Sequence, residues 1–276
     1  KGLLNVVVTD IGEIGDSFVE HPIPRIISFT GSTKVGSYIG QLAIKHFKKP
    51  LLELGGNSAL IVLEDADLEY AVNAATFSRF THQGQICMSA NRILVQKEVY
   101  PEFLKLFSQK VSGLKTGDPL DPETVIGPVI NERQAEHLRK SIEKGIEEGA
   151  TPLLKGDIKG NLVEPTILAD VTPDMSVAKE ELFGPVVCVM PFETEADAVE
   201  IANDTPFGLS GAVHTGNVES GVAIAKQIET GMIHVNDTTI NDEPHVAFGG
   251  EKQSGIGRLN GEWSLDEFTT LKWISV

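Results

Sequence analysis

Strand-like and helix-like segments alternate along this chain, and no other feature of the sequence limits its fold as strongly. Short apolar runs typical of buried strands occur at residues 3–8, 25–30, 58–63, 186–190 and 232–236. Apolar residues at helical spacing occur at residues 34–47, 68–75, 98–112, 131–148, near 195–203 and near 218–229. The alternation predicts an α/β fold with parallel strands.

Polar residues and glycines mark the ends of some of these helices. Asp65 is expected to cap the helix that follows the strand at 58–63. Asn131 and Gln134 occupy the N-cap and N3 positions of a capping-box pattern, and Gly149 is expected to stop that helix. The last ten residues, 267–276, mix β-branched and aromatic side chains and predict a terminal strand.

Composition and charge exclude several classes of partner. The chain has 276 residues, enough for one large domain or two, and its net charge of −16 repels nucleic acid and anionic membranes. Two cysteines are too few for a disulfide framework and fit a reducing compartment. No apolar run reaches the roughly 18 residues of a membrane span, and the first residues do not resemble a signal peptide. We expect a cytoplasmic protein with no nucleic-acid or membrane partner and no metal site.

The segment FTGSTKVG (29–36) places Gly31 and Ser32 where a strand gives way to a helix. The free N–H groups at a helix N-terminus bind phosphate, but glycine-bearing turns of this kind occur in any α/β protein. The segment also departs from the GxGxxG pattern, so the residues alone leave both interpretations open.

The two cysteines lie in different surroundings. Cys87 stands among polar and small residues in HQGQICMS, which is typical of an accessible thiol, although free cysteines as a class are most often buried. Cys188 lies in the continuous apolar run VVCVM, which indicates a structural role. Of the two, Cys87 is the candidate nucleophile.

Glu53 is a single carboxylate at the end of an apolar strand, followed by two glycines, in LLELGG. A buried glutamate is rare unless it is paired or functional, and burial raises its pKa toward that of a general base. The same sequence is also compatible with a strand-end glutamate that points to solvent.

Six motifs occur in one order along the chain: FTGST (29–33), LELGG (52–56), GQIC (84–87), EELFGPV (180–186), NDTPFGL (203–209) and FGGEKQSGIGR (248–258). Together they resemble the signature series of the aldehyde dehydrogenase superfamily, over the C-terminal part of its members and from end to end of this chain. The resemblance implies an oxidoreductase that converts an aldehyde to the carboxylic acid with NAD or NADP, NAD being slightly favoured.

The resemblance also implies roles for individual residues. Cys87 would attack the aldehyde, its backbone N–H would help to hold the oxyanion, and Glu53 would activate water to hydrolyse the thioester. Backbone dipoles and the nicotinamide ring would lower the thiol pKa, so His82 need not be catalytic. The cofactor would contact Ser32 at its pyrophosphate, Glu181 at its nicotinamide ribose and Phe183 beside its ring. The same site would include Gly31, Gly36, Leu54 and Gly55.

The resemblance further implies a domain organisation. Residues 1–54 would form the C-terminal half of a Rossmann-like cofactor domain, 55–254 the catalytic domain, 255–266 a return segment and 267–276 an oligomerisation strand. Because the chain begins at Lys1 and enters a strand at once, we expect a fragment. The family's oxyanion Asn and cofactor-binding Lys would lie upstream, so the fragment alone is expected to be inactive. The complete enzyme would be a homodimer or homotetramer.

One departure from the family pattern concerns the substrate. The family commonly has Lys after ELGG, whereas this chain has Asn57. With the run at 15–33, this resembles the subgroup that oxidises benzaldehyde, vanillin and related aromatic aldehydes.

Two other functions fit parts of the sequence. An inactive or truncated family member could act as a binding or structural protein, although the retention of Cys87, Glu53 and Glu181 counts against it. A cysteine hydrolase would need a histidine partner and no nucleotide site, and the FTGST turn counts against that.

Overall fold

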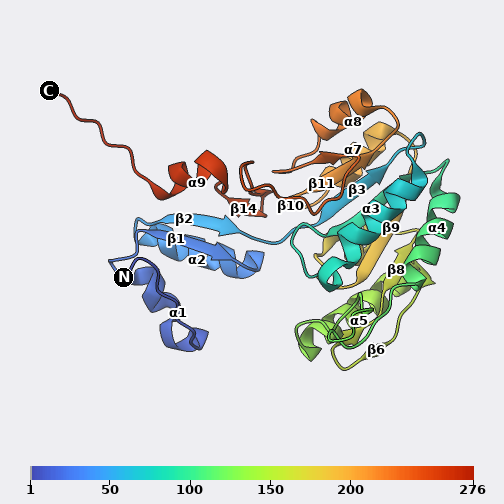
Figure 1. Cartoon of the computed structure of the whole chain (residues 1–276), viewed down its shortest axis with the longest axis horizontal. Helices are drawn as coiled ribbons and strands as arrows, with labels where there is room; N and C mark the ends of the chain where they lie inside the picture. Colours follow the sequence, from blue (N-terminus) through green and yellow to red (C-terminus); the bar gives the residue numbers. More distant parts are fainter. Residues whose placement is uncertain (1) are drawn as a thin grey trace.

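The structure, a computed structural model, describes residues 2–276 and contains a large and a small β-sheet that lie side by side (Figure 1). The prediction of an α/β fold is therefore confirmed. No helix within the described residues is long and apolar enough to cross a membrane.

The large sheet has seven strands, of which all but the last are parallel. In spatial order they are β12 (His234–Val235), β11 (Gly211–His214), β3 (Ser58–Val62), β4 (Ala90–Gln96), β9 (Val186–Phe192), β8 (Thr166–Ala169) and the antiparallel β5 (Thr151–Leu154). Parallel strands need crossover connections, which explains why the predicted helices fall between them.

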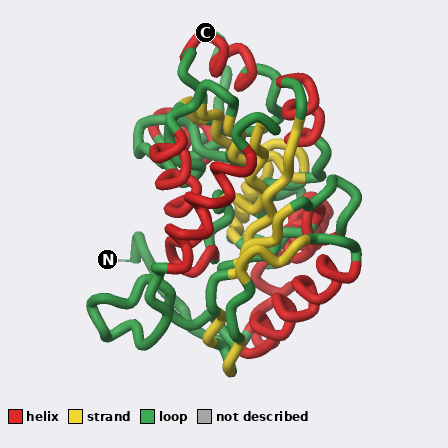
Figure 2. The backbone as a smooth tube through the Cα atoms, turned by 90° about the vertical axis from the view of Figure 1, so that its right-hand side faces the viewer, coloured by secondary structure: helices red, strands yellow, loops and turns green. Residues whose placement is uncertain are grey.

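Helices cover both faces of the large sheet, so its strands run through the middle of the molecule (Figure 2). One face packs against α3 (Leu68–Phe80) and α4 (Tyr100–Ser112), and the other against α5 (Glu132–Glu147), α7 (Glu195–Asn203) and α8 (Val218–Ala225). Along β3, Leu60 and Val62 point to the first face, whereas Ala59 and Ile61 point to the second. Burial on both faces accounts for the continuous apolar strands in the sequence.

The small sheet consists of β1 (Ile26–Thr30), β2 (Lys49–Glu53) and β14 (Gly255–Ile256). Strands β1 and β2 are parallel, with α2 (Thr33–Lys45) between them and α1 (Ile11–Glu20) packed on α2. The chain leaves β2 at Glu53 for the large sheet and returns when β14 pairs with β2. Two passages therefore connect the sheets.

Short elements complete the fold. They are η1 (Thr81–Gly84), β6 (Ile158–Lys159), β7 (Leu162–Val163), α6 (Ser176–Lys179), β10 (Phe207–Gly208), β13 (Glu251–Lys252) and α9 (Gly261–Phe268). Antiparallel pairing joins β10 to β13 and β6 to β7.

Both terminal strand predictions are wrong for the single chain. Residues 3–8 form no strand and precede α1, which the sequence analysis did not predict. The predicted strand at 267–276 is replaced by the end of α9, and residues 269–276 have no regular structure. In both cases no neighbouring strand is present to satisfy the backbone N–H and C=O groups, which an isolated strand cannot satisfy itself.

Two capping predictions also need correction. The cap of α3 is Asp67, which accepts from the Tyr70 N–H, whereas Asp65 accepts a hydrogen bond from the Thr215 hydroxyl. Asn131 caps α5 as predicted, but the Gln134 amide does not complete a capping box. It turns instead toward a loop described below.

Two arginines, Arg79 on α3 and Arg92 on β4, are buried beside or within the large sheet. Among the described residues, neither has a hydrogen bond to a carboxylate. Arg79 donates to the Gly184 carbonyl, and Arg92 donates to the carbonyls of Asn57, Ile201 and Ala202. Burial lowers the pKa of both guanidinium groups to about 10, so they stay charged at neutral pH. Backbone carbonyls thus take the place of water around these charges.

Candidate active site

A cavity of about 580 Å³ lies where the carboxyl end of β1 meets the large sheet. Ligands of open α/β sheets bind outside the carboxyl ends of strands, so this is the expected place for a site. Seven of the nine predicted site residues line it: Gly31, Ser32, Leu54, Gly55, Cys87, Glu181 and Phe183. Glu53 and Gly36 lie directly behind the lining.

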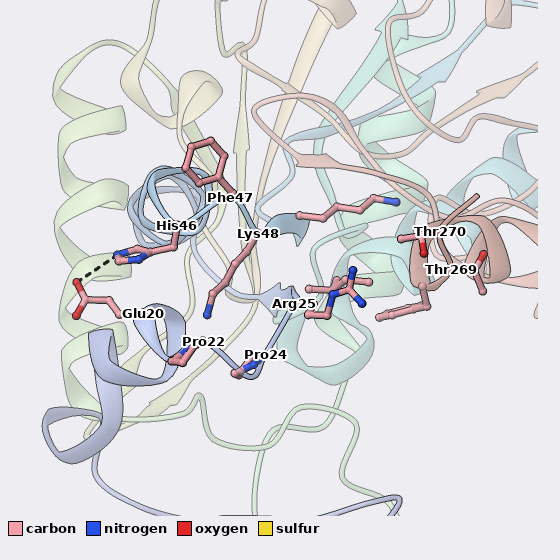
Figure 3. A pocket seen from close by; sticks show the side chains of 12 residues that line it. Glu20, Pro22, Pro24, Arg25, His46, Phe47, Lys48, Thr269 and Thr270 are labelled. Atoms are coloured by element: carbon pink, nitrogen blue, oxygen red, sulfur yellow. Dashed lines mark ion pairs between the residues drawn. The ribbon is translucent and has the colours of Figure 1, made fainter. Parts of the chain in front are cut away.

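A larger cavity, of about 790 Å³, opens at the opposite, amino ends of β1 and β2 (Figure 3). Its lining includes Arg25, His46 and Lys48, and Glu20 forms an ion pair with His46 at 3.6 Å. None of the predicted site residues lines it. The larger cavity is therefore not the candidate active site.

The turn between β1 and α2 presents a helix N-terminus to the smaller cavity. Ser32 caps α2, since its hydroxyl accepts from the Val35 N–H at 3.4 Å, and its own proton stays free for another acceptor. Thr33 joins this turn to two other motifs, because its hydroxyl accepts from Gly55 N–H at 3.3 Å and donates to the Gln253 carbonyl at 3.2 Å. Partial positive charge at a helix start suits an anionic group.

Two glycines allow the chain to pass from the small sheet to the large one. A Cβ on Gly55 would lie 2.4 Å from Glu181 Oε2, and one on Gly56 would lie 2.1 Å from the Cys87 carbonyl oxygen. The Gly56 N–H donates to Glu181 Oε1 at 2.9 Å. A side chain at Gly56 would collide with backbone, whereas one at Gly55 would displace the Glu181 carboxylate. The two glycines thus bring the LELGG, GQIC and EELFGPV segments into contact.

Gly36 has a packing role at this position. A Cβ there would lie 2.2 Å from Leu54 Cδ2, so the glycine lets α2 pack closely on the chain after β2. It supports Leu54 from behind and does not line the cavity.

Glu53 is only 7% exposed, and neither carboxylate oxygen has a hydrogen-bond partner. Burial raises its pKa to about 7, the positive charge of Arg258 lowers it, and the negative charge of Asp242 raises it. Pairing of β2 with β1 and β14 fixes its backbone. A carboxylate with this pKa is suited to take a proton near neutral pH.

Cys87 follows η1 and is partly buried at the cavity wall. Burial raises the pKa of its thiol to about 11, and the negative charges of Glu181 and Glu53 add to the rise. The N–H groups of Met88 and Cys87 lower the pKa, as expected, but by less. The expected lowering by backbone dipoles is therefore present, but burial and the two carboxylates outweigh it in the chain alone.

Glu181 and Phe183 approach the cavity from the segment between α6 and β9. Burial raises the pKa of Glu181, while the Gly56 N–H and the Arg79 charge lower it. Phe183 adopts φ of 49°, in the left-handed region that residues with a Cβ seldom adopt.

The sequence analysis missed five residues of the lining: Thr30, Gln85, Ile86, Gln134 and His137. Three of them, Thr30, Gln85 and Ile86, lie within recognised motifs and could have been found there. Gln134 and His137 lie on α5, where a polar residue on an amphipathic helix gives no sign that it faces a cavity instead of water. His82 is exposed and lies outside the lining.

The model of the aldehyde dehydrogenase family matches residues 1–274. The chain belongs to this family. It is 77% identical over 275 residues to benzaldehyde dehydrogenase YfmT of Bacillus subtilis (strain 168), and 49% identical over 277 residues to a vanillin dehydrogenase of Corynebacterium glutamicum. In both comparisons all of this chain is covered but only 57% of the relative.

The fold agrees with this membership. A salicylaldehyde dehydrogenase from Pseudomonas putida G7, solved with salicylaldehyde, matches with a TM-score of 0.93 at 41% identity, over 95% of this chain and 55% of that one. An aldehyde dehydrogenase of Mycobacterium tuberculosis solved with NAD+ and a glyceraldehyde-3-phosphate dehydrogenase of Methanocaldococcus jannaschii solved with NADP are also similar, with TM-scores of 0.89 and 0.90. The predicted resemblance to the benzaldehyde and vanillin dehydrogenases is confirmed.

Native alkylation should distinguish the two thiols. Cys87 lines the cavity, whereas Cys188 is 0% exposed and its Sγ lies 3.3 Å from the Val177 carbonyl. Iodoacetamide should therefore label Cys87 alone, as read by peptide mass spectrometry. Because the thiolate reacts and the pKa of Cys87 is about 11, labelling should accelerate roughly tenfold per pH unit between pH 7 and 9. Preferential labelling of Cys188 in the native protein would contradict the assignment.

Proposed function

We propose that this chain provides the nucleophile and the water-activating base of an enzyme that oxidises an aldehyde to the carboxylic acid with NAD or NADP. The observation that carries the proposal is that Cys87, Glu181 and the Gly31–Ser32 turn line one cavity, with Glu53 buried immediately behind it.

Three features of the cavity wall support a dinucleotide as its ligand. Its wall contains the N-terminus of α2, the carboxylate of Glu181 and the ring of Phe183, which suit a pyrophosphate, a ribose hydroxyl pair and a planar ring, respectively. When bound there, NAD or NADP would supply the hydride acceptor for the oxidation. NAD is slightly favoured over NADP.

The chain's own residues carry the remaining steps. Cys87 Sγ, once deprotonated, attacks the aldehyde carbon, and the Cys87 N–H donates to the oxygen that becomes negative. Loss of hydride leaves a thioester on Sγ. Glu53 then takes a proton from water, the hydroxide adds to the thioester carbon, and Sγ leaves as the acid is released.

We further propose that turnover needs the complete enzyme, in which this chain is continuous with the rest of its relatives' length. The small sheet supports this, because β1 has a free edge and α2 exposes Val35, Tyr38 and Ile44. The alternative is an inactive family member that serves as a binding or structural protein.

Replacing Glu53 with Gln in the complete enzyme should slow thioester hydrolysis by roughly 10² to 10⁴, since the base for water is lost. Acylation should change little, so the burst of reduced cofactor should remain and acyl-enzyme should accumulate, as seen by intact-protein mass spectrometry. In the unchanged enzyme, hydrolysis should fall as pH drops through about 7, where Glu53 becomes protonated. Loss of the burst with rapid hydrolysis would give Glu53 another role.

An aromatic substrate is supported by the relatives, among which benzaldehyde, vanillin and salicylaldehyde dehydrogenases recur. Asn57 marks this subgroup, but its side chain is buried and bonded to Ala178, Thr205 and Asn91, so it does not reach the substrate itself. The upstream part of the enzyme is expected to complete the ring pocket.

Specificity constants for benzaldehyde, vanillin and acetaldehyde test this substrate class. We expect kcat/KM for an aromatic aldehyde to exceed that for acetaldehyde about tenfold or more, because the aromatic ring buries far more apolar surface than a methyl group. A preference for acetaldehyde would remove the aromatic assignment and leave aldehyde oxidation in place. Absence of activity toward all three, with both Cys87 and cofactor accessible, would favour the binding-protein alternative.

We also propose that the complete enzyme is a homodimer or homotetramer held in part by its C-terminal residues. The segment after α9 extends away from the body (Figure 1), and Trp273 is 93% exposed. Its base is anchored, since Lys49 Nζ lies 2.5 Å from Glu267 Oε2 and the Arg258 N–H donates to Glu267 Oε1 at 3.1 Å. An exposed apolar segment on a fixed base is suited to join a neighbouring subunit's sheet.

Deleting residues 271–276, which leaves Glu267 and α9 in place, should reduce the oligomer to smaller species. Light scattering of the complete enzyme measures this directly. Replacing Lys272 with Ala is the control, because it removes an exposed charge and keeps the apolar side chains. An unchanged mass after the deletion would mean that these residues do not hold subunits together.

A further inference from the structure

The segment 180–184 holds its shape without forming a helix or strand. It lies between α6 and β9 and carries Glu181 and Phe183, two walls of the cavity. Backbone hydrogen bonds hold only its two ends, from Glu180 N–H to Ser176 and from Val186 N–H to Gly184, so side chains are needed to fix its middle.

Side chains from three elements form hydrogen bonds with the backbone of this segment. Gln134 on α5 donates to the carbonyls of Leu182 at 3.0 Å and Phe183 at 3.1 Å. Arg79 on α3 donates to the Gly184 carbonyl. Asn91 on β4 donates to the Glu180 carbonyl at 2.9 Å and accepts from the Leu182 N–H at 3.4 Å. Asn91 thus forms hydrogen bonds with the backbone on both sides of Glu181.

Asn91 acts together with Asn57. The two side chains are 1% and 2% exposed, and Asn91 Nδ2 donates to Asn57 Oδ1 at 2.8 Å. Asn57 Nδ2 in turn donates to the Ala178 carbonyl in α6 at 2.8 Å, just before the segment. A lysine at 57, the common residue of the family, has donors only and could not accept from Asn91. Asparagine at 57 therefore provides the acceptor that the Asn91 amide needs.

Asn91 differs from the other two side chains in what it touches. Gln134 lines the cavity, and the charge of Arg79 acts on Glu181, so replacing either would alter the site directly. Asn91 does not line the cavity. An effect of Asn91 on cofactor binding would have to pass through the segment.

We propose that Asn91, paired with Asn57, is a positioning residue that holds Glu181 and Phe183 in place for the cofactor. This rests on the proposed function, in which those two residues contact the nicotinamide half of NAD or NADP. Removing the Asn91 amide would leave the Glu180 carbonyl and the Leu182 N–H without a hydrogen-bond partner, and the segment would move to satisfy them.

The test is Asn91→Ala in the complete enzyme. We expect KM for the cofactor to rise about tenfold, with KM for the aldehyde and the alkylation rate of Cys87 within about twofold of the unchanged enzyme. Hydrogen exchange should quicken in peptides that cover 177–184. Asn203→Ala is the matched control, because Asn203 also bridges two backbone groups, at Gln227 and Glu229, but lies outside the cavity lining.

A double-mutant cycle tests the pair. The effects of Asn91→Ala and Asn57→Ala on cofactor KM should be less than additive, since each alone breaks the same link. If Asn91→Ala does not fold, Asn91→Ser, which keeps a polar group in a smaller volume, serves the same cycle.

Three results would overturn the proposal: an unchanged cofactor KM, exchange at 177–184 no faster than in the control, or fully additive effects. A change in Cys87 alkylation as large as that in cofactor KM would also overturn it, because Asn91 would then support the nucleophile's loop. Failure of the proposed function is distinguishable, since the unchanged enzyme would then show no aldehyde oxidation.

Discussion

The site depends on one passage of backbone, at Gly55 and Gly56, between the two sheets. At these two residues the chain runs so close to Glu181 and to the Cys87 carbonyl that any Cβ would collide with them. The LELGG, GQIC and EELFGPV segments therefore pack so closely that the space between them has no room for another side chain. The N–H groups of the same two glycines also donate hydrogen bonds, Gly56 to Glu181 and Gly55 to Thr33. The same two glycines therefore allow the close packing and provide hydrogen-bond donors to their neighbours.

Burial in this passage sets the chemistry of both reactive groups in opposite ways. Glu53 gains a pKa of about 7 and becomes a usable base, whereas Cys87 at about 11 is a poor nucleophile until something offsets the negative charges beside it. A positive nicotinamide ring in the cavity would supply that offset. Under the proposed function, the thiol would therefore stay largely protonated until NAD or NADP is bound.

Much of the site could be predicted from the sequence, because six ordered motifs resemble those of one family and the resemblance assigned them to a common site. The structure brings Gly31, Ser32, Leu54, Gly55 and Cys87 of these motifs to one cavity. What could not be read depends on distant partners. The side chain of Gln134 looks like a capping residue until the loop at 182–183 is present, and Asp65 loses its expected role to Thr215. The end segments look like strands, yet a strand needs a neighbour that this chain does not provide.

The buried guanidinium of Arg92 has a consequence for how the protein folds. It joins the carbonyl of Asn57 to those of Ile201 and Ala202, which are 109 and 110 residues away from it along the chain. A charge that persists at neutral pH keeps its water until these carbonyls have all arrived. Such non-local contacts are slow to form. During synthesis on the ribosome, the guanidinium can therefore leave water only after residue 202 has emerged, and the interior around Asn57 and Cys188 closes only then.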